Sequence, residues 1–388
     1  MDNSNIKNAS KNVCIVTWFS TSNYGTCLQS YSLYIVIGKL GFNTYISRSY
    51  RYPDTVIGGI KDIVKCLIPS NLICRRNNNK MYTGDSILKI KKILEVGNVY
   101  NDVTPYNFWG YRRLVDKMNI FVTGSDQLWN TRNYYDPFMF LSFARNKRRI
   151  AYGTSIGIKD FQESIKPQIK EFLSKYSFIG VREESAKKVV ARLTGRDDIV
   201  NVLDPTFLLT KTEWDSFCNS NNLDFSLPEN YILCYFIGNN TKYINDIYRI
   251  SHNMSIETII QIESSENRDF VIDKASIYKD GGPREFVYLI KNASIICTDS
   301  YHALVFSIIY SKRFVVFKRF PDENPDSQNS RIYDLLYKFG LTETLSRLKN
   351  DYSGNNEIDY NSLQEKLCIE RNKSLSFLEK SLGKTMNN

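Results

Sequence analysis

The sequence predicts an α/β protein with two domains, each built around a mainly parallel sheet. Its 388 residues exceed what one compact core usually holds. Short apolar runs alternate with helical patterns, and this alternation restarts after Asp204 and Pro205. We therefore expect one domain over 1–210, a second over 211–345 and a helical tail over 346–388. Two such domains in tandem form a ligand cleft at the carboxyl ends of their strands.

Each expected strand is a short apolar run, and each expected helix carries apolar residues three or four positions apart. In the first domain we expect strands at 12–18, 44–49, 120–123, 150–155, 178–182 and 200–203, and helices at 26–40, 161–175 and 184–193. In the second domain we expect strands at 231–237, 257–262, 293–298 and 314–317, and the tail is expected to form one helix over 361–383.

The formal net charge of +10 raises the question of a nucleic-acid partner. The basic residues are spread over the whole length, and no helix-turn-helix, zinc-finger or RNA-binding signature occurs. This distribution favours a small anionic donor or an anionic membrane surface over nucleic acid.

Location and cofactor content are also predicted from simple patterns. No apolar run with a small-residue cleavage site follows the first residues, and no stretch approaches the roughly 18 apolar residues of a membrane span. We therefore expect a cytoplasmic protein. Its eight cysteines include no CxxC pair and no nearby histidine at ligand spacing, so we expect buried free thiols, no metal site and no bound cofactor. They are Cys14, Cys27, Cys66, Cys74, Cys218, Cys234, Cys297 and Cys368.

Residues 54–76 carry apolar side chains at helical spacing, followed by Arg75 and Arg76. One interpretation is a helix that faces the core. The other is an interfacial helix at the inner face of the membrane, with the arginines at the lipid headgroups. The second interpretation would suit a lipid-linked sugar substrate.

Of the two histidines, His252 lies in a polar stretch and is predicted to be a surface residue. His302 follows an apolar strand through Asp299, Ser300 and Tyr301 and begins a helical segment. Backbone N–H groups are unpaired at a helix N-terminus and the helix dipole is positive there, so a histidine in this place can bind a phosphate and move a proton. The alternative is that Ser300 is a simple N-cap and His302 a packed surface residue.

A second polar group follows the expected strand at 120–123. Such a turn suits sugar hydroxyls, Asp126 can serve as a general base, and an aromatic face is a surface on which sugars stack. The alternative is ordinary turn chemistry. The group comprises Gly124, Ser125, Asp126, Gln127 and Trp129.

Two further motifs stand at strand ends. Asn23 and Gly25 lie in the loop after the first strand, which is a weak signal for phosphate binding because it matches no established glycine pattern. Arg182 ends the strand at 178–182, where its guanidinium can bind a carboxylate or a phosphate through two parallel hydrogen bonds. The alternative for Arg182 is a surface ion pair with a glutamate.

With these pieces in order, the chain resembles the polysaccharide pyruvyl transferase family over roughly residues 12–340. Any one segment is weak evidence, but together and in this order they are specific. The segments are Asn-x-Gly at 23–25, Gly-Ser-Asp-Gln-x-Trp-Asn at 124–130, Tyr-Gly-Thr-Ser-Ile-Gly at 152–157, Val-Arg-Glu-Glu-Ser at 181–185, Leu-Asp-Pro-Thr at 203–206, Gly-Pro-Arg-Glu-Phe at 282–286, Thr-Asp-Ser-Tyr-His-Ala at 298–303 and Asn-Ser-Arg-Ile at 329–332.

The resemblance implies two Rossmann-like domains that face a central cleft, as in GT-B glycosyltransferases. It also implies phosphoenolpyruvate as the donor, a sugar of a capsular or exopolysaccharide precursor as the acceptor, and a cyclic ketal as the product. His302, Asp126 and Asp299 are then the candidate catalytic residues. The candidate donor ligands are Arg182, Ser300, Tyr301, Arg284 and Arg331, and the candidate acceptor ligands are Asn23, Gly25, Ser125, Gln127, Trp129 and Ser155.

The chain departs from the family at one position. Some members carry an arginine two residues before the histidine, where this chain has Ser300. Another cation must then meet the negative charge of the donor, and Arg182, Arg284 and Arg331 are the candidates.

Two other functions remain open at this point. A GT-B glycosyltransferase with a nucleotide-sugar donor would share the architecture. A catalytically silent polysaccharide-binding subunit is the third possibility, and the intact set of Asp299, His302 and Arg182 argues against it.

Overall fold

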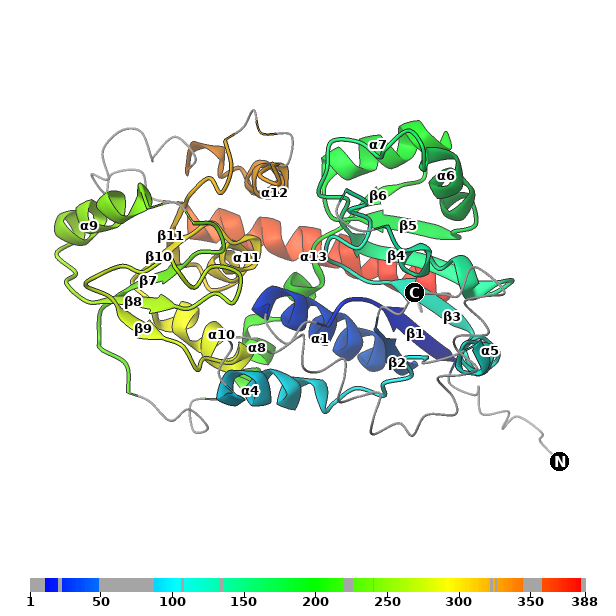
Figure 1. The fold of residues 1–388 in the computed structure, drawn as a ribbon, viewed down its shortest axis with the longest axis horizontal. Coiled ribbons are helices and arrows are strands. Elements are labelled where there is room, and N and C mark those ends of the chain that lie inside the picture. Colours follow the sequence, from blue (N-terminus) through cyan, green and yellow to red (C-terminus); the bar gives the residue numbers. More distant parts are fainter. Residues whose placement is uncertain are drawn as a thin grey trace.

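The fold was analysed in a computed structural model, and Figure 1 shows its course. The expected helix at 54–76, together with Cys66 and Cys74, lies outside the described residues. The structure describes residues 11–19, 23–48, 87–105, 108–132, 135–219, 226–239, 241–321, 324, 327–344 and 358–384.

The first sheet is parallel throughout, and its strands stand in the order β2-β1-β3-β4-β5-β6. The strand order changes direction at β1, since β2 lies on one side of it and β3 on the other. Such a point opens a crevice at the carboxyl ends of the strands. The strands are β1 (Asn12–Val16), β2 (Asn43–Ser47), β3 (Ile120–Thr123), β4 (Arg148–Thr154), β5 (Phe178–Val181) and β6 (Val200–Asn201).

Helices cover this sheet because its strands are apolar on both faces and must be shielded from water on both sides. The strand β3, for example, is buried along its whole length. The helical elements of this half are α1 (Tyr24–Lys39), α4 (Ile87–Gly97), α5 (Phe108–Lys117), α6 (Lys166–Ser174), α7 (Glu184–Thr194) and the short 3-10 turns η1 (Pro137–Phe140), η2 (Ser142–Ala144) and η3 (Pro205–Leu208).

The second sheet is also parallel, in the order β11-β10-β7-β8-β9. Its direction of growth changes between β7 and β10, so its own crevice opens there. The strands are β7 (Ile232–Tyr235), β8 (Ile259–Ile262), β9 (Ser276–Tyr278), β10 (Ile295–Thr298) and β11 (Arg313–Val316). The helices are α8 (Lys211–Phe217), α9 (Tyr243–Met254), α10 (Pro283–Asn292), α11 (Tyr301–Ile309) and α12 (Ser330–Phe339).

The two halves share an apolar core where α1 meets the second sheet's helices. The ring of Tyr24 stacks on Phe286 at a centroid distance of 4.9 Å, and its hydroxyl donates to the carbonyl of Gly281 at 2.6 Å. A single cluster of buried side chains runs from β1 through α1 into α10 and α11. The two sheets are therefore held together by apolar packing as well as by the chain connections.

The last helix, α13 (Tyr360–Leu382), runs from the second half back to the first (Figure 1). Lys338 on α12 pairs with Glu370 at 3.2 Å, while Ser374 Oγ accepts a bond from the backbone N–H of Leu203 at 2.9 Å. Near the end of the helix, Phe377 packs against Gly180 on β5, where an added Cβ would lie 2.6 Å from its ring. The predicted tail helix thus exists and packs against both halves.

The histidine, the cysteines and the helix lengths bear on three further expectations from the sequence. His252 is exposed near the C-terminal end of α9, as predicted. The six cysteines among the described residues are free, and all are buried except the exposed Cys368. Within the same residues, no helix is both long and apolar enough to cross a membrane.

Candidate active site

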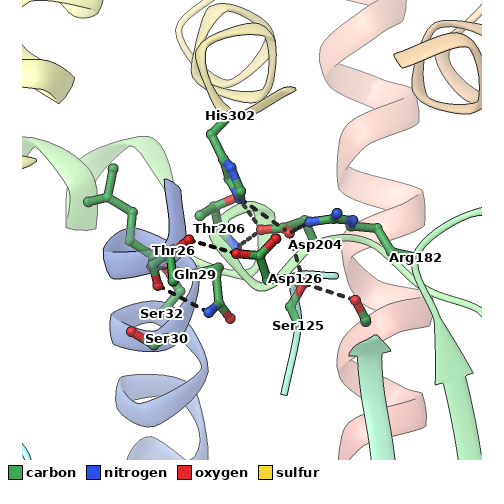
Figure 2. A network of polar contacts seen from close by, with 12 residues as sticks. Thr26, Gln29, Ser30, Ser32, Ser125, Asp126, Arg182, Asp204, Thr206 and His302 are labelled. Atoms are coloured by element: carbon green, nitrogen blue, oxygen red, sulfur yellow. Dashed lines mark hydrogen bonds and ion pairs between the residues drawn. The ribbon is translucent and has the colours of Figure 1, made fainter. Parts of the chain in front are cut away.

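Four polar side chains follow the carboxyl ends of strands from both sheets and meet between the two halves. Figure 2 shows His302 of α11 pointing toward Asp126 and Asp204 of the first half, with Arg182 beside them. Parallel strands bring such residues to one edge because all their carboxyl ends face the same way. The four are Asp126 after β3, Arg182 after β5, Asp204 after β6 and His302 after β10, while Arg319 after β11 lies beside Asp299.

His302 lies in the first turn of α11 and is largely buried. Ser300 caps this helix, with its hydroxyl oxygen 3.5 Å from the N–H of Ala303. The His302 ring rests against Gly25 in the first turn of α1, so close that a Cβ on Gly25 would lie 2.0 Å from Nδ1. The positive ends of two helices, one from each half, therefore meet at this histidine.

Asp204 is the carboxylate that connects the two halves of the site. Its Oδ1 accepts bonds from the N–H and the hydroxyl of Thr206 at 3.0 and 2.7 Å, which fixes the side chain. Its Oδ2 accepts a bond from Arg182 Nη1 at 2.7 Å and lies 2.9 Å from Ser125 Oγ. The same oxygen is 3.6 Å from His302 Nε2, an ion-pair distance if the ring is protonated.

Burial by itself would raise the pKa of Asp204. The charges of His302 and Arg182 and the bond from Thr206 outweigh burial and hold the pKa of this carboxyl well below its usual range. Asp204 is therefore ionised at neutral pH and places a negative charge beside His302 Nε2.

Asp204 was not among the site residues predicted from the sequence. The signal was present, because it begins the Asp-Pro-Thr turn that follows the last strand of the first sheet. Such a turn also has a purely local explanation, since an aspartate before Pro205 readily caps a 3-10 turn. Only the three-dimensional arrangement shows that its second oxygen faces Arg182 and His302.

Arg182 is almost fully buried and is held by two carboxylates. Besides Asp204, its Nε donates to Glu183 Oε1 at 3.0 Å, and the guanidinium lies over the Tyr301 ring at 4.3 Å. Burial would lower the pKa of Arg182, but the neighbouring acidic groups, with Glu183 first, raise that pKa overall. Among the described residues, its Nη2 has no hydrogen-bond partner. The alternative interpretation of Arg182, an ion pair with a glutamate, is right in its partner, Glu183, but wrong in placing the pair at the surface.

Arg331, in the first turn of α12, has a different environment. Its Nη2 donates to Gln328 Oε1 at 2.8 Å. The side-chain amide of Gln127 lies 2.9 Å from Nη1, and its oxygen accepts from Arg331 when the amide is oriented with that atom toward the guanidinium. Burial, followed by repulsion from Arg182 and Arg319, lowers the pKa of Arg331 to about 10.

Asp299 has a structural position. Its two carboxylate oxygens accept bonds from the backbone N–H groups of Ile237 and Gly238 at 2.7 and 2.8 Å, which holds the loop after β7. Arg319 Nε lies 3.6 Å from the same carboxylate. Burial raises the pKa of Asp299 despite these neighbours. Asp299 thus shapes the second half's crevice, while its oxygens are already occupied.

Asp126 has a backbone conformation that is rare for a residue with a side chain, with φ at 78°. Thr26 Oγ1 donates to its Oδ2 at 2.7 Å, and the N–H of Gln127 donates to its Oδ1 at 2.9 Å. Its backbone carbonyl accepts a bond from the N–H of Ser155 at 2.9 Å. Unfavourable backbone conformations of this kind are concentrated at functional sites, where the surrounding structure enforces them.

Two predicted ligands lie elsewhere. Trp129 is fully buried, stacks on Phe140 at a centroid distance of 5.5 Å and donates its indole N–H to the carbonyl of Met139 at 3.3 Å. It is a core residue and offers no face to a sugar. Arg284 donates to the backbone carbonyl of Phe217 and its guanidinium lies over the Phe217 ring. This guanidinium therefore lies at the C-terminal end of α8 and does not join the site.

The remaining predicted ligands are placed as follows. Asn23 caps α1 and its side-chain amide donates to Glu266 Oε1 at 2.8 Å, which links the two halves. Ser155 is fully buried, and its hydroxyl has no partner among the residues that the structure describes. Gln127 reaches the second half through Arg331.

A cavity of about 240 Å³ opens beside this group, between α7 and α12. Its wall combines charged groups of the site with apolar side chains such as Leu203 and Leu335. The charged and aromatic side chains that it shares with the site are Arg182, Asp204, Tyr301 and Arg331.

Comparison with known proteins gives one match in sequence. The family model for polysaccharide pyruvyl transferases matches residues 23–319, which is most of the chain. No curated protein matches the sequence.

Solved structures resemble this chain in fold at low sequence identity. A protein of Listeria monocytogenes assigned as a UDP-N-acetylglucosamine 2-epimerase is 9% identical, with a TM-score of 0.52 and 98% of each chain covered. The UDP-GlcNAc 2-epimerase of Neisseria meningitidis, bound to UDP-GlcNAc, is 10% identical, with a TM-score of 0.51 and coverage of 96% and 99%. Arabidopsis thaliana UGT89C1, complexed with quercetin, has 10% identity, a TM-score of 0.50 and the same coverage. The GT-B-like fold that we predicted is thus confirmed.

Proposed function

This chain belongs to the polysaccharide pyruvyl transferase family, and we propose that it transfers the pyruvyl group of phosphoenolpyruvate to a sugar of a cell-surface polysaccharide precursor. One observation carries the proposal. His302, at the positive ends of two helices, faces the ionised Asp204 carboxylate at 3.6 Å, within a group that also holds buried arginines. This combination supplies a proton donor and positive charge to the same small volume.

The reaction needs one proton transfer to carbon and two carbon–oxygen bonds. A proton added to the methylene carbon of phosphoenolpyruvate gives a methyl group and makes the adjacent carbon electrophilic. One sugar hydroxyl attacks that carbon, phosphate leaves with the electron pair of its carbon–oxygen bond, and a second hydroxyl closes the cyclic ketal. Of the two hydroxyl protons released, one replaces the proton given to the methylene carbon and the other leaves with phosphate.

Within this proposal, His302 is the acid and Asp126 the base. Asp204 holds an ionised carboxylate 3.6 Å from His302 Nε2, so the acid faces a fixed negative charge. Asp126 is held by Thr26 and by its own unusual backbone, so its carboxylate is fixed in position before an acceptor arrives. Both side chains lie in the same polar group between the two halves (Figure 2).

The proposal extends to the setting of the reaction. A capsular or exopolysaccharide precursor on a lipid carrier, at the cytoplasmic face of the membrane, would bring the sugar hydroxyls to the enzyme. The family supports a polysaccharide acceptor, and the lipid carrier and the membrane face are part of our proposal.

The first experiment is to incubate purified protein with phosphoenolpyruvate and an oligosaccharide extracted from the producing cell, and to measure released phosphate together with the acceptor's mass. We expect acceptor-dependent phosphate release and the mass increase of one pyruvyl ketal. His302→Ala should abolish both while the melting temperature stays close to that of the wild type. Transfer from a nucleotide sugar, without phosphate release from phosphoenolpyruvate, would instead establish a glycosyltransferase.

A further inference from the structure

Charge is unevenly distributed among the arginines of the site. Arg182 contacts two carboxylates, those of Asp204 and Glu183, at 2.7 and 3.0 Å. Its single positive charge is thus balanced by carboxylates of the protein, although Asp204 also faces His302. A further anion approaching Arg182 would be repelled by both carboxylates, so this residue by itself provides little net attraction for a phosphate or carboxylate.

Arg331 lacks such compensation. Its relative exposure is 8%, and its contacts are to amide and carbonyl oxygens of Gln328 and to the side-chain amide of Gln127. In the part of the chain that the structure describes, no carboxylate forms an ion pair with it. The carboxylates of Glu183 and Asp126 attract this guanidinium only from beyond ion-pair distance, while burial and the charges of Arg182 and Arg319 act against it. An anion that bound Arg331 directly would therefore be favoured.

The cavity places this charge within reach of a ligand. Arg331 and Tyr301 both line the space of about 240 Å³ between α7 and α12, and Tyr301 directly precedes His302. An anionic group bound to Arg331 from this space would therefore lie against the same helix turn that carries His302. The planar guanidinium can hold such a group through two parallel hydrogen bonds, as a carboxylate or phosphate requires.

We infer that Arg331, rather than Arg182, supplies the positive charge that holds an anionic group of the donor, and that Arg182 positions Asp204 and Tyr301 around it. The inference rests on the proposed function for the donor's identity. In some family members an arginine stands at the position of Ser300. We infer that Arg331 takes the place of that missing positive charge in this chain. Arg331 donates to neutral oxygens of Gln328 and Gln127. On binding, the charged oxygens of the donor would replace these neutral acceptors.

The test measures binding of phosphoenolpyruvate and of inorganic phosphate to the full chain by calorimetry, for the wild type and three variants. Arg331→Gln should weaken phosphoenolpyruvate binding at least about tenfold, which corresponds to about 1.4 kcal/mol. Arg331→Lys keeps the charge but loses the two-pronged geometry, so we expect an intermediate affinity. Arg284→Gln is the matched control, because it removes an arginine that ends α8 and does not join the site.

A second measurement separates ligand binding from a structural role. If Arg331 serves a ligand, Arg331→Gln removes a buried charge that has no direct ion-pair partner among the described residues, and the melting temperature without ligand should stay unchanged or rise. A marked fall in melting temperature, or wild-type affinity for phosphoenolpyruvate in Arg331→Gln, would overturn the inference and leave the proposed function standing. If the wild type ignores phosphoenolpyruvate but binds a nucleotide sugar through Arg331, the assignment of Arg331 survives and the proposed donor does not.

Discussion

The ring of His302 occupies the space where residue 25 would carry a Cβ. That atom would lie 2.0 Å from Nδ1, so the first turn of α1 accepts the histidine only because residue 25 is glycine. Gly25 and His302 lie far apart in the sequence, yet the size of residue 25 decides whether the histidine ring fits.

Gly25→Ala should consequently displace the His302 ring and reduce turnover by roughly a hundredfold, the usual effect of moving a catalytic group by about 1 Å. Steady-state kinetics and thermal melting would measure this. Gly38→Ala in the same helix is the control, since its Cβ would have only Thr44 Oγ1 nearby, at 3.7 Å. Gly38→Ala should keep full activity, and equal losses in both variants would contradict the steric explanation.

Asp204→Asn should impair both stability and turnover. It keeps the shape of the side chain but removes the charge that faces Arg182 and His302, and breaking a buried ion pair typically costs about 3–5 kcal/mol of unfolding free energy. Chemical denaturation would measure the loss. The same change should reduce kcat at every pH, because His302 loses the carboxylate that faces its Nε2.

The acid stability of the protein should also depend on Asp204. Its pKa is depressed in the folded chain, so the unfolded chain binds an extra proton once the pH falls below the ordinary aspartate value of about 3.9. The stabilisation is fully present above that pH and is lost progressively as the pH falls further. Unfolding free energies between about pH 2 and 4 should fall more steeply for the wild type than for Asp204→Asn, and parallel curves would refute this.

Asp126→Asn is expected to abolish turnover while leaving donor affinity unchanged. Asparagine tolerates the positive φ of 78°, so the fold should persist, but an amide cannot accept the acceptor's proton. Asp126→Ala has the additional strain of a left-handed backbone and should lose roughly 1 kcal/mol of stability relative to the asparagine variant. Calorimetry with phosphoenolpyruvate and thermal melts of both variants would check these expectations.

Trp129→Phe tests whether Trp129 is a core residue and not a surface that binds sugar. Because Trp129 is buried against Phe140 and bonded to Met139, the substitution should lower unfolding free energy by roughly 1–3 kcal/mol. The KM for the acceptor should not change at temperatures where the variant is folded. A selective rise in that KM would restore Trp129 as a sugar platform.

Most strands could be predicted from the sequence because their apolar runs are buried, as in β3 and β7. His302 could be placed at a helix start for the same local reason. The strand β9 was not predicted, because its three residues are exposed or half-buried and form no apolar run. Trp129 could not be placed correctly, because a tryptophan after a polar turn suits a core and a sugar surface equally well. The role of Arg284 depends on Phe217, which is distant in sequence. The role of Asp204 depends likewise on Arg182 and His302, so neither role could be predicted from local sequence.

The helix α13 has a consequence for how the chain folds during synthesis. The ring of Phe377 covers Gly180 on β5, and Ser374 Oγ accepts a hydrogen bond from the backbone N–H of Leu203. When the first sheet leaves the ribosome, the residues that cover this face have not yet been translated. The first half therefore cannot complete its core until the last helix emerges, so the order of synthesis and the order of consolidation differ.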